Sequence, residues 1–241
     1  MGLENKPGSL ILLAAGKSQR FGGQENKLLI PIAGTCALER CVRLALCLPF
    51  IHEVIVVVSD ETASFLEENL GRIYASKSPI APPVKICQGG NERFDSVGSG
   101  LSKVSCEVVL VHDASRPFAT ASLYERVYKA VRPGVGVVPL ISVVDSLVQI
   151  NEERNELAYK DRAQFMLVQT PQGFMTADLR SAWKKAAEEG SSYSDEGSLF
   201  ISAGFQVVAV DGERTNIKIT YESDLEMVLP IELLKGRENQ C

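Results

Sequence analysis

A run of four aliphatic residues, Leu10 to Leu13, stops abruptly at the tiny residues Ala14, Ala15 and Gly16. An uninterrupted aliphatic run of this length is typical of a strand buried on both faces, as in a parallel sheet. The small residues after it predict a tight turn whose backbone N–H groups can approach a ligand closely. The chain is therefore expected to build a parallel α/β fold with a candidate anion-binding turn after its first strand.

Arg20 and Lys27 follow this turn and complete what a polyphosphate needs. An Arg side chain holds two oxygens at once, and a Lys side chain acts as a point charge. The alternative is an ordinary strand-to-helix turn with solvated basic residues. The loop has neither the GxxxxGK[ST] pattern of a P-loop nor the GxGxxG pattern of a dinucleotide site, which excludes those two classes.

Composition limits the remaining function classes. The 241 residues are 45% hydrophobic and 23% charged with a net charge of −5, which argues against a general nucleic-acid binder. No apolar run approaches the ~20 residues of a membrane span, and the N-terminal sequence lacks the pattern of a signal peptide. Six cysteines without a CxxC motif and only two histidines indicate reduced core thiols in a cytoplasmic protein, without a His-rich zinc site.

Strand-like and helix-like segments alternate along the chain. This order predicts one Rossmann-like α/β domain over residues 1–241, with a mostly parallel twisted sheet and helices on both faces. Strands are expected at 9–13, 53–58, 84–88, 108–111, 134–140, 165–169, 206–210 and 217–219. Helices are expected at 35–48, 60–70, from 91 to 102, and at 120–131, 176–189 and 194–204, and from a capping box at 223–226 to about residue 235. Residues 71–83, which contain three prolines, are expected to form a loop.

Residues 142–162 interrupt this alternation. Two apolar stretches flank the polar turn at 151–156, which predicts a protruding β-hairpin arm. Because a lone hairpin is only marginally stable in water, we expect this arm to pack on a partner. The expectation that this partner is a second subunit, giving a homodimer, rests in part on the family resemblance described below. The alternative is a hairpin that folds back on its own domain.

Three further motifs directly follow strands and are therefore expected at one edge of the sheet. The first contains Gly90, Asn91 and Ser96 at the start of a helix, where glycines are also common for structural reasons. The second contains Asp113, which could bind a substrate hydroxyl or Mg²⁺, and Arg116, which could bind a phosphate, although a structural ion pair is the alternative.

The third motif places Lys218 on the expected strand at 217–219, between two isoleucines. The isoleucines are expected to face the core, and the lysine the opposite side. A solvated lysine at a sheet edge is the alternative to a catalytic one.

Together, AAG-x-S-x-R with Lys27, GG-x-x-R-x-x-S-V, HDASRPF, TPQ-x-F and NIKIT resemble one family over roughly residues 9–230. That family is the 2-C-methyl-D-erythritol 4-phosphate cytidylyltransferases of the non-mevalonate isoprenoid pathway. The resemblance implies that CTP and methylerythritol phosphate are joined, with Mg²⁺, into a CDP-alcohol and pyrophosphate. It does not identify a protein ligand of the metal.

The resemblance also implies roles for individual residues. Those expected to hold the triphosphate are Ala14, Ala15, Gly16, Arg20 and Lys27, and those expected to read cytosine are Gly90, Asn91 and Ser96. Those expected to bind the acceptor are Asp113, Arg116, Thr170 and Lys218, with Ser146 and, in the partner subunit's site, Arg162. Arg20, Lys27 and Lys218 are the expected catalytic residues.

The chain departs from the family pattern at several positions. Ser18 stands where Gly is usual, Asn26 where Pro is frequent and Leu28 where Gln is frequent, and the arm lacks the usual basic residue after Ser146. These changes affect acceptor recognition and loop rigidity more than reaction type. Two other readings stay open: a cytidylyltransferase for another polyol phosphate such as ribitol 5-phosphate, and a non-catalytic nucleotide-binding protein.

Overall fold

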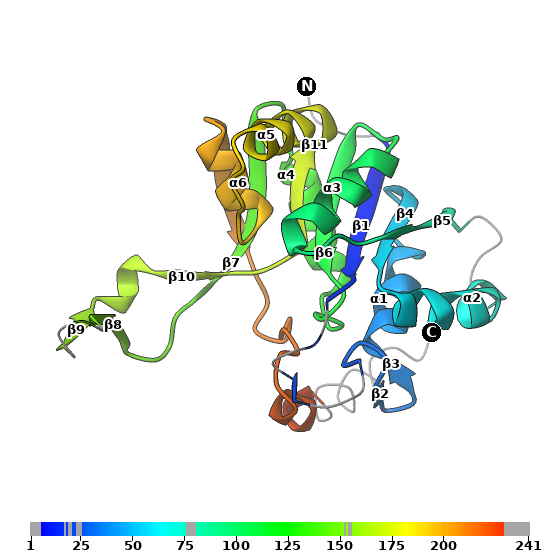
Figure 1. Cartoon of the computed structure of the whole chain (residues 1–241), viewed down its shortest axis with the longest axis horizontal. Coiled ribbons are helices and arrows are strands. Elements are labelled where there is room, and N and C mark those ends of the chain that lie inside the picture. Colours follow the sequence, from blue (N-terminus) through cyan, green and yellow to red (C-terminus); the bar gives the residue numbers. More distant parts are fainter. Residues whose placement is uncertain are drawn as a thin grey trace.

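The computed structural model describes residues 6–16, 18, 21–22, 26–75, 81–151, 153 and 156–228. Its main sheet has the order β10-β7-β11-β6-β1-β4-β5, and β12 also pairs with β7 (Figure 1). The strands are β1 Gly8–Ala14, β4 Ile51–Val58, β5 Val84–Gln88, β6 Val108–Asp113, β7 Val135–Ser142, β10 Met166–Val168, β11 Gln172–Met175 and β12 Gln206–Asp211. The pairs β5–β4, β4–β1, β1–β6 and β12–β7 are parallel, whereas β10 and β11 pair antiparallel to their neighbours.

Helices cover both faces of this sheet, as the sequence predicts. They are α1 Ala37–Ala45, α2 Asp60–Ala75, α3 Arg93–Lys103, α4 Ala121–Ala130, α5 Thr176–Glu188 and α6 Glu196–Ser202. Alternate residues of β1 point to opposite faces: Leu10 and Leu12 pack with α1, α2 and α4, and Ile11 packs with α3, α5 and α6. Among the described residues, no helix is both long and apolar enough to cross a membrane.

Two small hairpins lie outside the main sheet. Strands β2 (Pro31–Ile32) and β3 (Thr35–Cys36) form one of them, and β8 (Leu147–Asn151) and β9 (Glu156–Lys160) form the other. The β8–β9 hairpin extends away from the body of the molecule, so the predicted protruding arm is present (Figure 1). Neither Val143 nor Val144 belongs to β8, which begins later than the apolar pattern indicates.

Several predicted boundaries are wrong. Thr35 pairs with Ile32 in the β2–β3 hairpin, so helix α1 begins at Ala37 and not at a Thr35 cap, and it ends at Ala45. Residues 71–75 belong to α2, because fully buried Ile73 gives this last turn an apolar contact with the core. The strand β11 is too short to predict from periodicity.

The C-terminal predictions are partly wrong. Residues 217–219 form no strand, and their backbone is held by other loops instead. Residues 223–228 are helical, and the Asp224 carboxylate accepts the N–H groups of Thr220 and Tyr221. The expected end of this helix lies outside the described residues.

Helix α3 packs very tightly against α5 at one glycine. A Cβ atom at Gly98 would lie 2.2 Å from the ring of Trp183, which stacks on Phe94 and donates to the Phe94 carbonyl oxygen at 3.1 Å. A side chain at this position would have to displace a rigid indole ring. The glycine therefore fixes how closely α3 lies on α5.

We expect Gly98→Ala to lower the free energy of unfolding by about 1–3 kcal/mol, because the overpacking outweighs the better helix propensity of alanine. Urea denaturation monitored by circular dichroism measures this change. The matched control is Gly71→Ala in α2, where the new Cβ atom meets nothing within 4 Å. This control should stabilise the protein by up to about 1 kcal/mol. Equal effects of the two substitutions would contradict the packing argument.

Candidate active site

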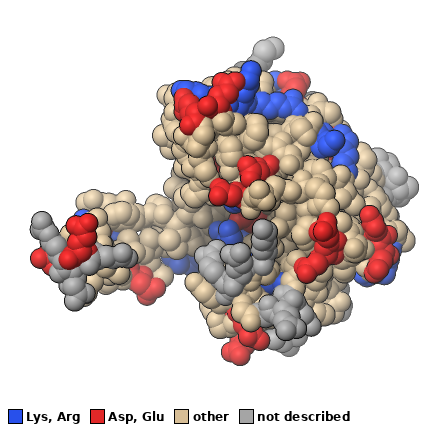
Figure 2. Space-filling model, viewed as in Figure 1, with Lys and Arg blue, Asp and Glu red and all other residues tan. Residues whose placement is uncertain are grey.

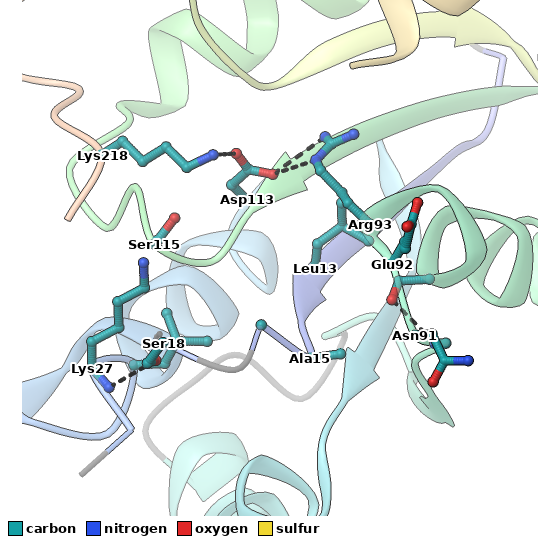
Figure 3. Close-up of a pocket in the computed structure, with 14 residues that line it drawn as sticks. Leu13, Ala15, Ser18, Lys27, Asn91, Glu92, Arg93, Asp113, Ser115 and Lys218 are labelled. Atoms are coloured by element: carbon teal, nitrogen blue, oxygen red, sulfur yellow. Dashed lines mark hydrogen bonds and ion pairs between the residues drawn. The ribbon is translucent and has the colours of Figure 1, made fainter. Parts of the chain in front are cut away.

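A cavity of about 470 Å³ opens at the carboxyl ends of β1 and β6. These strands are neighbours at the point where the strand order reverses, which is the usual ligand-binding position in open α/β sheets. Residues from four separate segments therefore meet there (Figure 3). The lining residues are Leu13, Ala15, Gly16, Ser18, Lys27, Leu28, Gly90, Asn91, Glu92, Arg93, Ser96, Asp113, Ser115 and Lys218.

The loop after β1 brings Lys27 to the cavity. The Ser18 hydroxyl accepts the backbone N–H of Lys27 at 3.4 Å, and Ser18 adopts a left-handed backbone conformation with φ 49°. Such a φ favours glycine and costs a serine of order 1 kcal/mol. The Lys27 side chain extends toward the part of the cavity where Ser115 lies (Figure 3).

The glycines after β5 are required by packing. A Cβ atom at Gly89 would lie 2.3 Å from the Ala15 Cβ, and one at Gly90 would lie 2.2 Å from the Asp95 Cβ. The Ser96 hydroxyl accepts the Gly90 N–H at 3.2 Å and so fixes the turn from within. The two loops expected to hold the nucleotide are thus in direct contact.

Four charged side chains form an alternating chain through this site. Glu196 accepts two bonds from the Arg93 guanidinium, at 2.6 and 2.9 Å, and Arg93 also donates to Asp113 Oδ1 at 3.3 Å. Lys218 Nζ lies 2.8 Å from Asp113 Oδ2, so two cations approach this carboxylate from opposite sides (Figure 3). These four side chains are two carboxylates and two cations, so their charges balance.

This arrangement keeps Asp113 ionised. Burial alone would raise the pKa of its carboxyl group, but the positive charges of Arg93 and Lys218 outweigh burial and hold the pKa well below its ordinary value. Burial alone would lower the pKa of Arg93, but the carboxylates of Glu196 and Asp113 outweigh burial and raise this pKa above its ordinary value. The cavity therefore presents a permanent carboxylate next to a permanent guanidinium.

Lys218 reaches the cavity from an irregular segment and not from the predicted strand. Arg116 donates to the Asn216 carbonyl oxygen at 2.9 Å, and the Ile219 N–H donates to the Ser115 carbonyl oxygen at 2.8 Å. The Ile219 side chain is fully buried, as predicted, and anchors the segment. These contacts hold Lys218 over the end of β6.

Buried hydrogen bonds support Asp113 from behind. Its backbone N–H donates to the Thr170 hydroxyl at 3.2 Å, and this hydroxyl lies 3.0 Å from His112 Nδ1. His112 Nε2 lies 3.1 Å from the Arg116 carbonyl oxygen. A neutral His112 that donates from Nε2 and accepts at Nδ1 satisfies all of these groups.

The cavity also limits how a metal ion could be held. The described residues contain no cluster of three or more His, Cys, Asp or Glu side chains suited to a metal. A cavity carboxylate such as Asp113, together with phosphate oxygens of a substrate, is nevertheless the donor set that Mg²⁺ commonly uses. The residues present therefore fit a magnesium ion carried largely by the substrate.

The structure brings most of the predicted site residues together. Ala15, Gly16, Lys27, Gly90, Asn91, Ser96, Asp113 and Lys218 all line the cavity. Others lie outside its lining: buried Ala14 and Thr170 behind it, Arg116 against the Asn216 and Val168 carbonyl oxygens, and Ser146 and Arg162 exposed at the arm. Arg20 lies outside the described residues.

Sequence reasoning missed Arg93 and Glu196, two of the four charged side chains that interact in this site. Arg93 lies within the quoted GG-x-x-R motif, three residues after Gly90, and this position could have suggested a role. Glu196 begins α6 and is only 2% exposed, but it is 103 residues from Arg93 along the chain. No local pattern indicates such a pair.

Comparison with known proteins gives one consistent family. The sequence profile of the family described as 2-C-methyl-D-erythritol 4-phosphate cytidylyltransferase matches residues 9–231. A relative of that name from Caldanaerobacter subterraneus subsp. tengcongensis is 36% identical over 226 residues, covering 90% of this chain and 95% of the relative. Another of that name, from Dictyoglomus thermophilum, is 35% identical over 224 residues, covering 89% of this chain and 92% of the relative.

Solved structures agree with this result. The crystal structure of the cytidylyltransferase of the same name from Thermus thermophilus is similar with a TM-score of 0.74 at 30% identity, covering 92% of this chain and 97% of that one. The 4-diphosphocytidyl-2C-methyl-D-erythritol synthase of Anaerococcus prevotii has a TM-score of 0.81 at 24% identity, covering 96% and 98%. At this lower identity the likeness supports the fold alone.

The burial of His112 predicts a specific pH dependence of stability. Burial lowers its pKa from 6.5 to about 4, although the neighbouring Asp113 opposes this shift. As pH falls, His112 is therefore protonated in the unfolded chain before it is protonated in the folded protein. The free energy of unfolding that His112 contributes above pH 6.5 is lost as pH falls toward 4. We expect a loss of about 2 kcal/mol between pH 7 and pH 5 in urea denaturation.

In His112→Gln this slope should be clearly flatter, although the variant is less stable at pH 7. His52→Gln, at an exposed position, is the matched control for the loss of a histidine. The lowered pKa values of Glu39, Glu53, Asp113 and Asp195 affect stability only below about pH 4.5, outside this window. An unchanged slope in His112→Gln would contradict the assignment.

Proposed function

The chain belongs to the 2-C-methyl-D-erythritol 4-phosphate cytidylyltransferase family, and from this premise we propose how its cavity acts. The proposed reaction joins CTP to 2-C-methyl-D-erythritol 4-phosphate and gives 4-diphosphocytidyl-2-C-methyl-D-erythritol and pyrophosphate. The observation that carries this proposal is the meeting of Lys27, Lys218 and Asp113 at the carboxyl ends of β1 and β6. None of the described cysteines forms a disulfide, which is consistent with the proposed action in the cytoplasm. Cys47 is exposed and is not the core thiol expected.

The nucleophile is a phosphate oxygen of the acceptor. The second pKa of a phosphate monoester is about 6, so this oxygen is already anionic near neutral pH and needs no general base. His112 is neutral, buried and engaged by Thr170 and Arg116, in agreement with this requirement. Catalysis is therefore positioning and charge neutralisation while the oxygen attacks the α-phosphorus of CTP in line.

The chain's own cations provide this neutralisation. Lys27 and Arg20 stabilise the charge on the triphosphate and on the departing pyrophosphate, and Lys218 holds the acceptor near the α-phosphate. Asp113 keeps Lys218 in place, and its further proposed partner is either a substrate hydroxyl or a magnesium ion. A magnesium ion, held by Asp113 and phosphate oxygens, would supply further positive charge when bound.

The cytidine and the far end of the acceptor require other residues. Gly90, Asn91 and Ser96 form the proposed cytosine site beside Ala15 and the α3 N-terminus. Ala14 and Gly16 belong to the backbone turn proposed to hold the triphosphate. Arg116 and Thr170 are proposed to contribute to acceptor binding indirectly. Thr170 positions Asp113, and Arg116 positions the segment that carries Lys218.

The arm is proposed to form a homodimer. The pairs Val148–Tyr159 and Ile150–Leu157 lie opposite each other in β8 and β9, so all four side chains share one face of the hairpin. Their exposed fractions are 41%, 77%, 63% and 62%, and the stem of the arm shows mainly uncharged residues in Figure 2. An apolar face of this kind fits a second subunit, where Ser146 and Arg162 would approach the partner's acceptor site.

Activity is tested by Mg²⁺-dependent pyrophosphate release from CTP. We expect release with 2-C-methyl-D-erythritol 4-phosphate and its loss after EDTA treatment. Release with ribitol 5-phosphate instead would keep the site and change the acceptor. CTP binding without release to either acceptor would favour the non-catalytic nucleotide-binding protein.

In the same assay, Lys27→Ala should lower kcat by about 100-fold or more, because a cation at the transferring phosphate is lost. Its thermal unfolding midpoint should stay close to that of the wild type. Lys184→Ala, which removes a 77% exposed lysine on α5, is the matched control and should retain full activity. A fully active Lys27→Ala enzyme would remove Lys27 from the mechanism.

The dimer is tested with two separate variants, one that places a negative charge on the apolar face of the arm and one that places it on the opposite face. Leu157→Asp should raise the dimer dissociation constant at least about 100-fold, since each subunit loses an apolar contact. Ala158→Asp, on the same strand but the opposite face, is the matched control. Sedimentation velocity should give twice the 26.2 kDa chain mass for the wild type and the chain mass for Leu157→Asp. A monomeric wild type would overturn the dimer.

A further inference from the structure

The first turn of α2 contacts three separate segments of the nucleotide side of the cavity. Thr62 Oγ1 donates to the Ala14 carbonyl oxygen at 3.1 Å, and Glu61 Oε2 accepts from Asn26 Nδ2 at 2.9 Å. Asp60 Oδ1 accepts from Gln88 Nε2 at 2.9 Å. None of these three consecutive residues lines the cavity.

Each of the three residues that α2 contacts comes immediately before a residue or turn at the cavity. Ala14 precedes Ala15, Asn26 precedes Lys27, and Gln88 precedes the Gly89-Gly90 turn. The end of β1, the lysine loop and the end of β5 are thus tied to one helical turn. The spacing between the three segments depends on that turn.

Asn26 forms the central link. Its side chain is 9% exposed and is bonded at both ends: Oδ1 accepts the Leu28 N–H at 3.1 Å while Nδ2 donates to Glu61. Its backbone carbonyl oxygen accepts the Leu29 N–H at 2.8 Å. The backbone on both sides of Lys27 is therefore held through one amide side chain.

Glu61, an exposed residue, ties this link to the first turn of α2. A carboxylate in the first turn of a helix is stabilised by the helix dipole, and an amide that donates to a charged acceptor forms a stronger bond than one to a neutral group. The helix itself is fixed in the core by Leu66 and Ile73, both fully buried. We infer that Glu61 is a positioning residue that holds Lys27 in the cavity through Asn26.

This inference rests on the proposed role of Lys27 at the triphosphate. If it is correct, Glu61→Ala should lower kcat/KM for CTP about tenfold, the effect of one lost charge-assisted hydrogen bond. The KM for the acceptor should not change, since the acceptor side of the cavity has no contact with this turn among the described residues. Glu61→Gln, which can still accept from Asn26, should stay within about threefold of the wild type.

Three further variants complete the experiment. Asn26→Ala breaks the same contact from the loop side and leaves the helix intact, so it should reproduce the loss even if Glu61→Ala folds poorly. The double variant should be no worse than Asn26→Ala alone, because Asn26→Ala already removes the bond to Glu61 together with the bond to the Leu28 N–H. Glu68→Ala, at an exposed position of the same helix, is the matched control and should behave as the wild type.

Hydrogen exchange measured by mass spectrometry gives a second readout that does not require turnover. The peptide containing the Leu28 and Leu29 amides should exchange faster in Glu61→Ala than in Glu68→Ala. A wild type without pyrophosphate release would overturn the proposed function, and this exchange difference would then decide the positioning role by itself.

Two results would overturn the inference. One is an unchanged kcat/KM for CTP together with unchanged exchange in Glu61→Ala. The other is a loss of activity that comes with a raised KM for the acceptor, that Glu61→Gln does not restore and that follows the fall in thermal stability. Either result would leave Glu61 as an ordinary helix-end residue.

Discussion

The charge balance around Asp113 is the constraint on which the site depends. A carboxylate at the end of a buried strand is costly unless cations compensate it, and here Arg93 and Lys218 do so from two different parts of the fold. Glu196 in turn takes much of the hydrogen-bonding capacity of Arg93. The carboxylate is therefore compensated without being fully enclosed, and it stays accessible in the cavity.

The sheet explains why these groups can meet. The parallel strands β1, β4, β5 and β6 end at one edge, and the reversal of strand order separates the connections that follow β1 and β6. The antiparallel β11 fills the space between β6 and β7 and brings Thr170 behind Asp113. The segment after β12 then returns across this edge and delivers Lys218.

Much of this arrangement can be predicted from the sequence, because the central strands β1, β4 and β6 each contain a continuous apolar run. Strands such as Val84–Gln88 agree with the prediction residue for residue, and motifs that follow such strands do converge. The prediction of a strand at 217–219 is wrong because both isoleucines pack on the core from an irregular segment, Ile219 fully buried and Ile217 partly buried, and not from a sheet. The Arg93–Glu196 pair depends on tertiary contacts that leave no local pattern.

The close packing of α3 on α5 has a consequence for observing this protein. Trp183 is the only tryptophan of the chain, and it stacks on Phe94, the residue that follows Arg93. The indole ring thus lies beside the turn that carries the proposed cytosine site. Its intrinsic fluorescence is a built-in optical reporter of that turn, so events in the cavity can be followed in the unmodified chain without an added dye.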